Sequence, residues 1–490
     1  MSRVEWILVA GATGYVGGHL VPRLLKDGYR VRVLTRDAEK VRAAPWASNV
    51  DVITGDVLEA STLGPALSGI KTAYYLVHSI TRGSDFAQRD ILAGQNFGEA
   101  AKKAGVERVI YLGGLGDPET KLSEHLKSRQ ETGDALRRSG VRVTEFRAAI
   151  IVGPGSVAFE MIRYLTERVP IMICPRWVRT RVQPIGIDDV IEYLAASLRN
   201  ASSTGQIIEI GGADVLTYGE MMKDYARVRG LHRGLVHVPV LTPRLSSYWV
   251  HWVTPVPAAF ARPLIEGLRS EVVVRDNTAS ELFPEIEPAG YKSAVRRSLS
   301  QLHPDAFETF VAQSAAPHDT ERPSTFKTIH NGMIVEIKQC LVRSRAAAVY
   351  KAFTELGGPN NWPCHWAWRI RALLDRMLGG VGMRKGRPDP NAIKVGDTLD
   401  YFRIVEIQPG RMIRLKVDMK LPGQGWLQFE AVPTEEDRSQ LLQTVFFAPK
   451  GLLGFAYWYM LYPLHALIFN KMIREIALRS EQIETAGVDK

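Results

Sequence analysis

Residues 6–20 of this 490-residue chain read WILVAGATGYVGGHL. Trp6 to Ala10 form an apolar run typical of a buried strand, and the glycine-rich loop GATGYVG that follows leads directly into a helical pattern. A glycine loop in that position brings free backbone N–H groups at a helix start against the negative charge of a pyrophosphate. The stretch therefore predicts an α/β domain that binds a dinucleotide at its first strand-to-helix turn.

Each glycine of this loop has a predicted task. Gly11 permits the tight turn, Gly14 lets the backbone approach the pyrophosphate, and Gly17 allows close packing of the helix. A glycine turn without a ligand is the alternative interpretation. The residues of the loop predicted to bind the cofactor are Gly11, Ala12, Thr13, Gly14, Tyr15, Val16 and Gly17.

The end of the second predicted strand, Leu34-Thr35-Arg36-Asp37, bears on which dinucleotide is bound. An acidic residue there binds the ribose hydroxyls of NAD(H), whereas a cation pairs with the extra phosphate of NADP(H). The guanidinium of Arg36 matches phosphate geometry, so NADP(H) is the favoured cofactor. Asp37 directly after it keeps NAD(H) open, and a solvated loop cation is the alternative interpretation of Arg36.

Strand-like and helical patterns alternate along the first part of the chain, which is typical of a parallel sheet with helices on both faces. We therefore expect a doubly wound Rossmann sheet. From 205 to about 301 the pattern gives way to short elements and Pro-rich turns, which predict a small substrate lobe inside a first domain of residues 1–311. The predicted strands are 6–10, 30–35, 51–54, 72–77, 106–112 and 141–147, and the predicted helices are 19–26, 85–104 and 123–139.

A Ser-, Ala- and Pro-rich stretch at 312–324 predicts a linker, and a second domain is expected over 325–490. Its pattern predicts an α+β domain with an antiparallel sheet around a long final helix at about 453–480. Along 412–420, apolar residues such as Ile413 and Leu415 alternate with polar ones such as Arg414 and Lys416, so one sheet face should be dry and the other wet. The remaining predicted elements are strands 334–342, 398–407, 412–420, 425–432 and 439–447 and a short helix at 346–354.

Composition indicates a soluble globular protein, with 46% apolar and 23% charged residues. The net charge of +10 raises the question of an anionic partner. Lysines and arginines are scattered without a recognition motif, so nucleic acid is not expected, and a phosphate-bearing cofactor or a membrane surface explains the excess better. The spacing of Cys174, Cys340 and Cys364 predicts neither disulfides nor a metal site.

Two features bear on location. Residues 1–5 run straight into the first strand, which leaves no room for a signal peptide and predicts a cytoplasmic protein. Residues 451–473 read GLLGFAYWYMLYPLHALIFNKMI and approach the length that spans a bilayer. Because Pro463, His465 and Asn470 would then lie in hydrocarbon, an internal amphipathic helix is favoured. Peripheral contact at the inner face of the membrane and a true span are the alternatives.

Several phrases beyond the glycine loop resemble the extended and atypical short-chain dehydrogenase/reductases, and the resemblance covers roughly residues 4–212. They are Gly55-Asp56-Val57 and Leu76-Val77-His78-Ser79. In that superfamily the aspartate matching Asp56 lies near the adenine. The resemblance implies an NAD(P)-dependent oxidoreductase, and the residues it adds to the predicted cofactor site are Asp56, Val57, Val77, His78, Ser79, Gly113 and Arg129.

The chain departs from the superfamily at the positions that carry the usual reaction. Members use a serine after the fifth strand and a YxxxK pair on the next helix, whereas here Gly113 stands at the serine position and residues 125–129 read HLKSR. We predict that His125 acts as a neutral hydrogen-bond donor to an oxyanion, because the permanent charge of Arg129 one turn away disfavours its protonated form. Arg129 is expected to hold the cofactor's ribose or phosphates. Exposed helix positions are the alternative for both residues.

The second domain resembles the helix-grip architecture of START-like and polyketide-cyclase-like proteins, which implies an apolar ligand cavity. Phrases such as YLGGLGD, EHLKSRQETG and LTPRLSSYW make the whole chain similar to a bacterial family of atypical short-chain reductases with a C-terminal domain of unknown function. The aromatic residues of the second domain are expected either to line a pocket or to fill a core. They are Trp362, Trp366, Trp368, Trp426, Tyr457, Trp458, Tyr459 and Tyr462.

These features together favour an NADPH-dependent reductase of a hydrophobic carbonyl or conjugated alkene. The small-molecule substrate would be held or delivered by the helix-grip domain. The alternative is a non-catalytic NADPH-sensing or lipid-binding scaffold protein. The sequence leaves the oligomeric state open.

Overall fold

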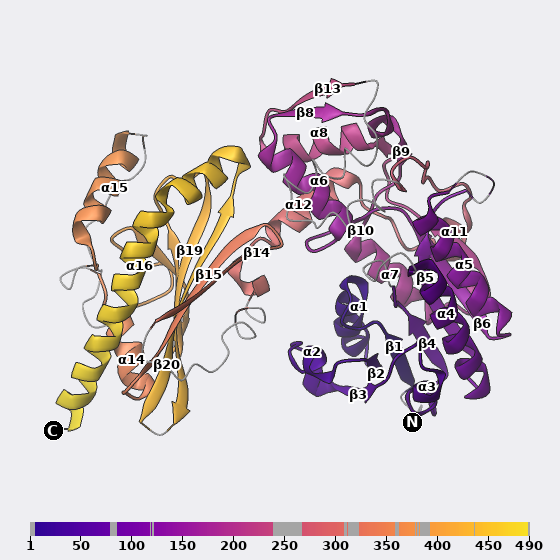
Figure 1. Ribbon diagram of the computed structural model, residues 1–490, viewed down its shortest axis with the longest axis horizontal. Helices are drawn as coiled ribbons and strands as arrows, with labels where there is room; N and C mark the ends of the chain where they lie inside the picture. Colours follow the sequence, from indigo (N-terminus) through magenta and orange to yellow (C-terminus); the bar gives the residue numbers. More distant parts are fainter. Residues whose placement is uncertain are drawn as a thin grey trace. The chain divides into compact units, whose positions relative to one another are not determined.

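The apolar run at the start of the chain forms β1 (Trp6–Ala10), which lies inside a seven-stranded sheet. The other strands are β2 (Arg30–Thr35), β3 (Val50–Thr54), β4 (Thr72–Tyr75), β5 (Arg108–Gly114), β6 (Arg142–Ala148) and β11 (Ile207–Ile210). Their order is β11-β6-β5-β4-β1-β2-β3, and every pairing is parallel (Figure 1). The order reverses between β1 and β4, and doubly wound sheets bind ligands at such a switch point, outside the carboxyl ends of the strands.

This sheet belongs to the first of two compact units, Met1–Gln301 and Leu302–Lys490. The division falls before residue 311, where the sequence predicted the first domain to end. The computed structural model describes residues 5–78, 86–117, 119, 122–238, 267–307, 311, 323–357, 362–377, 379, 382, 393–435 and 437–488.

Helices cover both faces of the parallel sheet. On one face lie α1 (Tyr15–Lys26) and α7 (Ile187–Ser197), and on the other lie α3 (Leu63–Leu67), α4 (Phe86–Lys103) and α5 (Glu124–Arg138). Ile7 and Val9 of β1 pack on the α1 side, whereas Leu8 and Ala10 pack on the α3 side, and all four are fully buried. Burial on both faces explains why β1 is apolar at every position.

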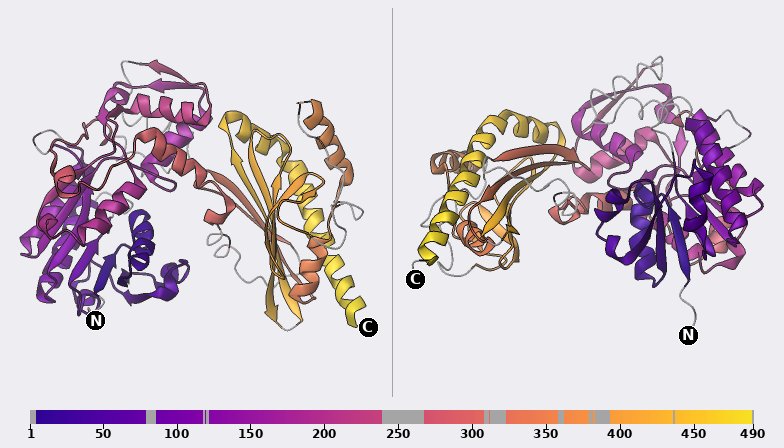
Figure 2. Two further views of the ribbon diagram at one scale, coloured as in Figure 1. Left: turned by 180° about the vertical axis from the view of Figure 1, so that it is seen from behind. Right: turned by 60° about the horizontal axis from the view of Figure 1, so that its bottom comes forward.

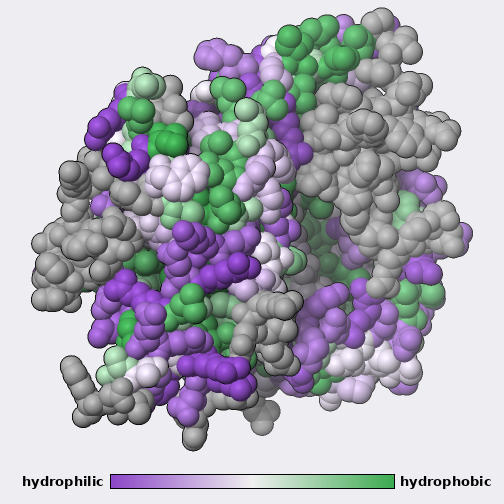
Figure 3. All heavy atoms as spheres, turned by 60° about the vertical axis from the view of Figure 1, so that its left-hand side comes forward, coloured by the Kyte–Doolittle hydropathy of each residue, from purple (hydrophilic) through white to green (hydrophobic). Residues whose placement is uncertain are grey.

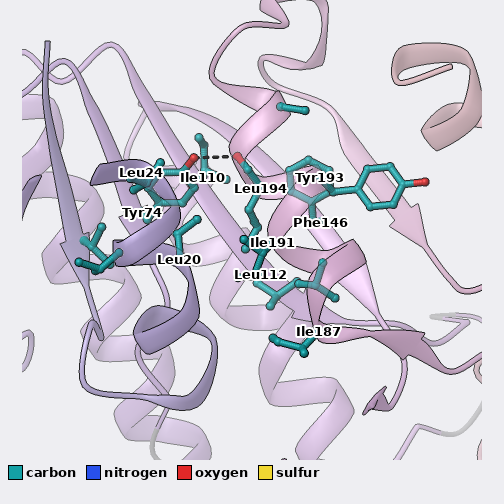
Figure 4. Packing of buried hydrophobic residues seen from close by; sticks show 14 of the residues in the cluster. Leu20, Leu24, Tyr74, Ile110, Leu112, Phe146, Ile187, Ile191, Tyr193 and Leu194 are labelled. Carbon is teal, nitrogen blue, oxygen red and sulfur yellow. Dashed lines mark hydrogen bonds between the residues drawn. The ribbon is translucent and has the colours of Figure 1, made fainter. Parts of the chain in front are cut away.

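The layer between the sheet, α1 and α7 is drawn in Figure 4. Leu20 and Leu24 of α1 face Ile191 of α7 within one buried cluster. The hydroxyl of Tyr74 donates a hydrogen bond of 2.7 Å to the carbonyl of Leu194, so the buried phenol is satisfied (Figure 4). This contact fixes β4, next to the switch point, against α7.

Arg108 at the start of β5 is a buried cation that joins the sheet to the end of α7. Its guanidinium donates to the Ser197 carbonyl, to the Ser203 hydroxyl at the same distance of 2.6 Å, and to the Thr144 hydroxyl at 2.9 Å. Each partner would lose a charge-assisted bond if the side chain were shortened.

We expect Arg108→Ala to lower the free energy of unfolding of the first unit by about 3 kcal/mol, because buried acceptors would be left unsatisfied. The measurement is calorimetric unfolding of the full chain. Arg142→Ala is the matched control, since Arg142 also opens a strand but is exposed. Equal unfolding temperatures for the two variants would contradict the role given to Arg108.

The predicted doubly wound sheet is confirmed, and the first six strands lie close to their predicted bounds. One strand, β11, lies within the stretch predicted as the substrate lobe and extends the main sheet instead. Among the described residues of this stretch and of the segment before it, the further strands pair two by two and further α-helices accompany them. These are β7 (Ile151–Val152) with β10 (Ile185–Gly186), β8 (Ile171–Cys174) with β13 (Gly234–His237), β9 (Arg181–Val182) with β12 (Leu216–Thr217), α6 (Val157–Arg168), α8 (Tyr218–Arg229), α11 (Thr278–Leu282) and α12 (Tyr291–Ser300).

The second unit is an antiparallel sheet with a long helix across one face. Its strands are β14 (Ser324–His330), β15 (Met333–Val342), β16 (Thr398–Leu399), β17 (Phe402–Gln408), β18 (Met412–Val417), β19 (Gly423–Glu435) and β20 (Arg438–Pro449). They pair in the order β14-β15-β20-β19-β18-β17-β16. The helices are α14 (Ala346–Thr354), α15 (His365–Met377) and α16 (Gly451–Val488).

The helix α16 lies across the sheet, as the views from opposite sides in Figure 1 and Figure 2 show. Lys338 of β15 donates a hydrogen bond of 2.8 Å to the side-chain oxygen of Asn470 in α16. The predicted antiparallel sheet and long final helix are thereby confirmed. Two elements, β14 and α15, were not predicted, and residues 312–322 of the predicted linker lie outside the described residues.

The alternation along β18 predicted that one face of the sheet is exposed to solvent, and this prediction is wrong at Arg414. Its side chain is 1% exposed. Its guanidinium donates to Gln428 at 2.6 Å and also pairs with Glu406 and Asp305. Asp305 precedes the whole sheet in sequence, so a local pattern could not show that this segment reaches Arg414.

The aromatic residues of this unit divide between core and surface. Trp362, Trp426 and Trp458 are buried, as expected for a core, whereas Trp366 and Tyr459 are exposed. All three cysteines of the chain are buried free thiols.

Candidate functional site

A cleft of about 950 Å³ lies at the carboxyl edge of the parallel sheet, around the switch point between β1 and β4. Its volume is at the upper end of the range for small-molecule sites. The predicted residues that line it are Gly11, Thr13, Gly14, Tyr15, Val16, Gly17, Arg36, Asp56, Val57, Val77, His78, Gly113, His125 and Arg129.

Two predicted cofactor residues need separate mention. Ala12 is 1% exposed and packs into the core beneath the loop, so its side chain does not line the cleft. Ser79 lies outside the described residues.

The glycine loop is shaped so that side chains are excluded from it. Gly11 has a φ of 92°, which favours glycine, and a Cβ on it would lie 2.7 Å from the Leu76 carbonyl oxygen. A Cβ on Gly17 would lie 2.2 Å from the Gly11 carbonyl oxygen. Gly11 thus lets the loop lie against the segment that follows β4, and Gly17 lets the first turn of α1 pack closely against the loop.

The start of α1 is suited to an anion. Gly14 is the N-cap residue, no side chain caps this end, and the first turn has no acidic residue. The first N–H groups of a helix have no partner within it. Since the loop backbone is bare and the helix dipole is positive here, the residues present fit a dinucleotide pyrophosphate.

Two charged residues, Arg36 and Asp37, follow each other at the end of β2, and they make different contacts. Arg36 is exposed and lines the cleft. Asp37 lines the same cleft, and its carboxylate accepts a hydrogen bond of 3.1 Å from the Glu39 N–H and caps α2 (Ala38–Arg42). Lys40 adds a second cation to the same wall. This wall therefore carries two cations and one carboxylate, and the carboxylate caps α2 and lies 3.8 Å from the Lys40 ammonium.

A group of polar side chains lies farther along the cleft, at the ends of β4 and β5. The rings of His78 and His125 stack with centroids 5.0 Å apart. Nδ1 of His78 lies 3.1 Å from a carboxylate oxygen of Asp90, which is buried on α4. The cleft therefore brings the segment after β4 together with α5, and Asp90 of α4 holds His78 from outside the cleft lining.

Arg129, one turn after His125, is held against β5. Its guanidinium lies 5.4 Å from the centroid of the Tyr111 ring and donates to the Leu112 carbonyl. The Tyr111 hydroxyl returns a hydrogen bond of 2.7 Å to the Arg129 carbonyl. The predicted pair is therefore half-buried at the cleft wall.

The surroundings keep His125 neutral. Burial is the largest cause, and together with the positive charges of His78 and Arg129 it lowers the pKa of His125 to about 3. The pKa of His78 is also lowered, chiefly by burial and then by Arg129, against the opposing effect of Asp90. The predicted influence of Arg129 on His125 is present, although burial is the larger cause.

Sequence reasoning missed Asp90 and the apolar end of the cleft. Asp90 follows Phe86 by four positions on the buried side of α4, and an acid on an apolar helix face is a signal that could have been noticed. The apolar end includes Leu126, Ile150, Met161, Tyr218, Leu268 and Val272. Among the described residues, no group of three or more His, Cys, Asp or Glu side chains is arranged to hold a metal ion.

Two family models match the chain. Residues 4–230 match the NmrA-like family, and residues 333–472 match DUF2867, a family of proteins of unknown function. The first match lies within the first unit and makes it similar to the NmrA-like family. For the second unit the matches give a family without an assigned activity.

Individual relatives resemble the first unit. Ceramide reductase of Caulobacter vibrioides is 29% identical over 240 residues, which are 48% of this chain and 73% of that protein. Photosystem II assembly factor Ycf39 of Cyanophora paradoxa is 24% identical over 256 residues, 50% of this chain and 76% of that protein. The solved structure of triphenylmethane reductase from Citrobacter sp. is 20% identical with a TM-score of 0.50, covers 60% of this chain and 99% of its own, and shows likeness of fold alone.

Proposed function

We propose that this chain is an NAD(P)H-dependent reductase, with NADPH as its favoured cofactor, that acts on a carbonyl or conjugated alkene of a hydrophobic substrate. The observation that carries the proposal is the continuity of one cleft. It runs from the glycine loop and Arg36, past His78 and His125, to an apolar end that includes Met161 and Leu268. Such a cleft suits a phosphate-rich cofactor at one end and an apolar molecule at the other. The match to the NmrA-like family and a relative named as a reductase support the same reaction class.

In this proposal the residues of the chain bind the cofactor, orient the substrate and polarise its reacting group. The loop N–H groups and Arg36 hold the phosphates, and the dinucleotide supplies the hydride when bound. Neutral His125 donates a hydrogen bond to the oxygen on which negative charge develops, which stabilises the transition state, and solvent water supplies the proton that completes the reduction. Stacking against His78, itself held by Asp90, fixes the ring plane of His125. The apolar end positions the substrate and excludes water.

Purified full chain incubated with NADPH and a panel of hydrophobic enones and ketones tests the proposal through loss of reduced-nicotinamide absorbance. Native mass spectrometry of the protein as purified would identify a retained dinucleotide or apolar ligand. Consumption of NADPH with one of these substrates is expected. Tight NADPH binding without turnover across the panel would contradict the enzymatic proposal.

Cofactor preference makes a separate prediction. Arg36→Ala should weaken NADPH binding by about tenfold to a hundredfold and leave NADH binding nearly unchanged, because a charge-assisted contact with the extra phosphate is lost. Titration calorimetry with each dinucleotide measures both. Arg42→Ala is the control, since Arg42 is an exposed cation of the same helix region that pairs with Glu39. Equal weakening of both dinucleotides by Arg36→Ala would refute the phosphate role.

A second candidate is a non-catalytic NADPH sensor or scaffold. Two observations favour it. His125 is neutral and therefore cannot act as an imidazolium acid, and the guanidinium of Arg129 already donates a hydrogen bond to the Leu112 carbonyl. A relative named as an assembly factor is in keeping with such a role. The sensor predicts a change in proteolytic protection on NADPH binding without NADPH consumption.

For the second unit we propose a role in holding the hydrophobic ligand, as in helix-grip proteins. Support comes from polar atoms enclosed around β15 and α16: Glu336 is fully buried, and the Trp458 indole nitrogen and His465 Nδ1 have no hydrogen-bond partner among the described residues. Buried groups of this kind would give an apolar ligand a polar anchor.

A cytoplasmic location is proposed for the chain.

A further inference from the structure

Exposed apolar side chains form one stripe on α15 and another on the first half of α16. The α15 stripe has the helical spacing i, i+4, i+7, i+11, and the α16 stripe repeats every seven residues, so each lies on one side of its helix. Every member is more than half exposed. The two stripes, here called the docking face, consist of Trp366, Ile370, Leu373 and Met377 on α15 and Leu453, Met460 and Leu467 on α16.

The opposite side of α16 is occupied by the sheet. Phe455, Trp458, Phe469 and Met472 are buried, and the ring of Trp458 stacks on Phe447 of β20 at 5.4 Å. Nevertheless this helix contains an 18-residue window with a mean hydropathy of 1.4, and only 28% of that window is buried. A helix held by the sheet on one side cannot cross a bilayer without leaving the sheet. Its apolar exposed side therefore lacks the cover that a core helix has.

The two stripes belong to neighbouring parts of the second unit. The guanidinium of Arg371 in α15 lies 5.9 Å from the centroid of the Tyr457 ring in α16. Figure 3 brings forward the side of Figure 1 that carries α15 and α16, and it shows green hydrophobic side chains in patches among purple hydrophilic ones.

Cations border the docking face. Arg369 and Arg376 are exposed beside the α15 stripe, and Lys450 is exposed at the first end of the α16 stripe; Lys471, at the other end, pairs with Glu475 at 3.5 Å. Between Lys450 and Arg474 the sequence has no acidic residue. On α15 the single acid, Asp375, is fully buried and accepts hydrogen bonds from the Lys420 and Gly382 N–H groups.

We propose that the docking face binds the surface of a membrane that contains anionic lipid, with α15 and the first half of α16 lying against the headgroups. Aliphatic side chains along one side of a helix, Trp366 among them on α15, with cations beside them and no exposed carboxylate among the described residues of α15 and of α16 before Glu475, are features of helices that lie in a membrane interface. The side chains of Leu453 to Leu467 extend over about 21 Å of helix, long enough for several to insert together. This proposal is independent of the reductase proposal, and α15 supplies a part of the face that the sequence did not predict.

The test is flotation of the full chain with vesicles of phosphatidylcholine mixed with phosphatidylglycerol and with vesicles of phosphatidylcholine alone. The wild type should float with the mixed vesicles and less with the neutral ones. Ile370→Glu and Met460→Glu should each lower the partition coefficient on the order of tenfold, because a charge replaces an inserting apolar side chain. Arg369→Ala and Arg376→Ala should each weaken binding to the anionic vesicles by about fivefold.

Leu478→Glu is the matched control, since Leu478 is equally exposed on the same helix but lies beyond the first acidic residue, Glu475. It should float like the wild type, and NADPH titration of each variant reports separately on the first unit. Failure of the wild type to float with anionic vesicles would overturn the proposal, as would flotation of Ile370→Glu and Met460→Glu at the wild-type level. A vesicle-free dimer that both substitutions convert to monomer would assign the face to a second copy of the chain instead.

Discussion

Gly17→Ala is expected to abolish dinucleotide binding and to destabilise the first unit by roughly 2–4 kcal/mol, among the larger effects for a single methyl group. The added Cβ would lie 2.2 Å from the Gly11 carbonyl oxygen and 2.8 Å from the Ala12 Cα. Both neighbours are backbone, so no side chain can rotate away. Either α1 moves off the loop or the loop opens, and each change removes the N–H cradle.

The next residue provides the control. A Cβ on Gly18 would meet nothing closer than the Ala12 carbonyl oxygen at 3.8 Å, which is ordinary contact. Gly18→Ala should therefore bind NADPH like the wild type and gain up to about 1 kcal/mol of stability from its higher helix propensity. Calorimetric unfolding and NADPH titration measure both variants. If Gly17→Ala bound NADPH as tightly as Gly18→Ala, the loop would not be the cofactor cradle.

His125→Ala should lower kcat by about a hundredfold once a substrate is identified, with little change in NADPH affinity, because one preorganised donor to the developing oxyanion is removed. His125→Asn, which keeps an N–H donor, should recover part of the loss. His232→Ala is the matched control, since His232 is an exposed histidine that does not line the cleft. A wild-type kcat for His125→Ala would end the catalytic assignment.

The same residue makes a prediction about pH. Because burial and nearby positive charge lower the pKa of His125 to about 3, it stays neutral across the range from about pH 5 to pH 8, and kcat should not depend on its protonation there. A protonated acid would instead lose activity tenfold per pH unit above its pKa. For stability, the unfolded chain takes up a proton at His125 below the ordinary pKa of 6.5 while the folded chain does not, so unfolding is favoured as pH falls from 6.5 toward 3. His125→Ala should reduce that acid sensitivity.

The parts of the fold that could be predicted depend on local signals. β1, the glycine loop and α1 follow one another within residues 6–26, so the apolar run and the glycine spacing define them together. Arg36 was identified because its place at a strand end fixes its position at the cleft. His125 and Arg129 were found only through the departure from a family motif, and their half-buried setting against Tyr111 needed the structure.

The parts that could not be predicted depend on contacts between distant segments. Asp90 meets His78 because α4 packs beside β4, and neither residue type indicates the other. Arg414 is buried because Asp305 reaches it from a segment that precedes the sheet. The helix α15 did have a signal, since Trp366, Ile370 and Leu373 keep helical spacing, but the aromatic residues around it favoured an interpretation as pocket or core.

The helix cap at Asp37 has an evolutionary consequence. One oxygen of its carboxylate, Oδ1, holds the first turn of α2 through the Glu39 N–H, so a bidentate contact with the ribose hydroxyls of NADH would compete with that cap. A descendant that changed its coenzyme would acquire the new acid at Arg36 itself, an exposed position whose replacement leaves the fold intact. Selection for a different coenzyme would then act on residue 36, and selection for stability of the fold would act on Asp37.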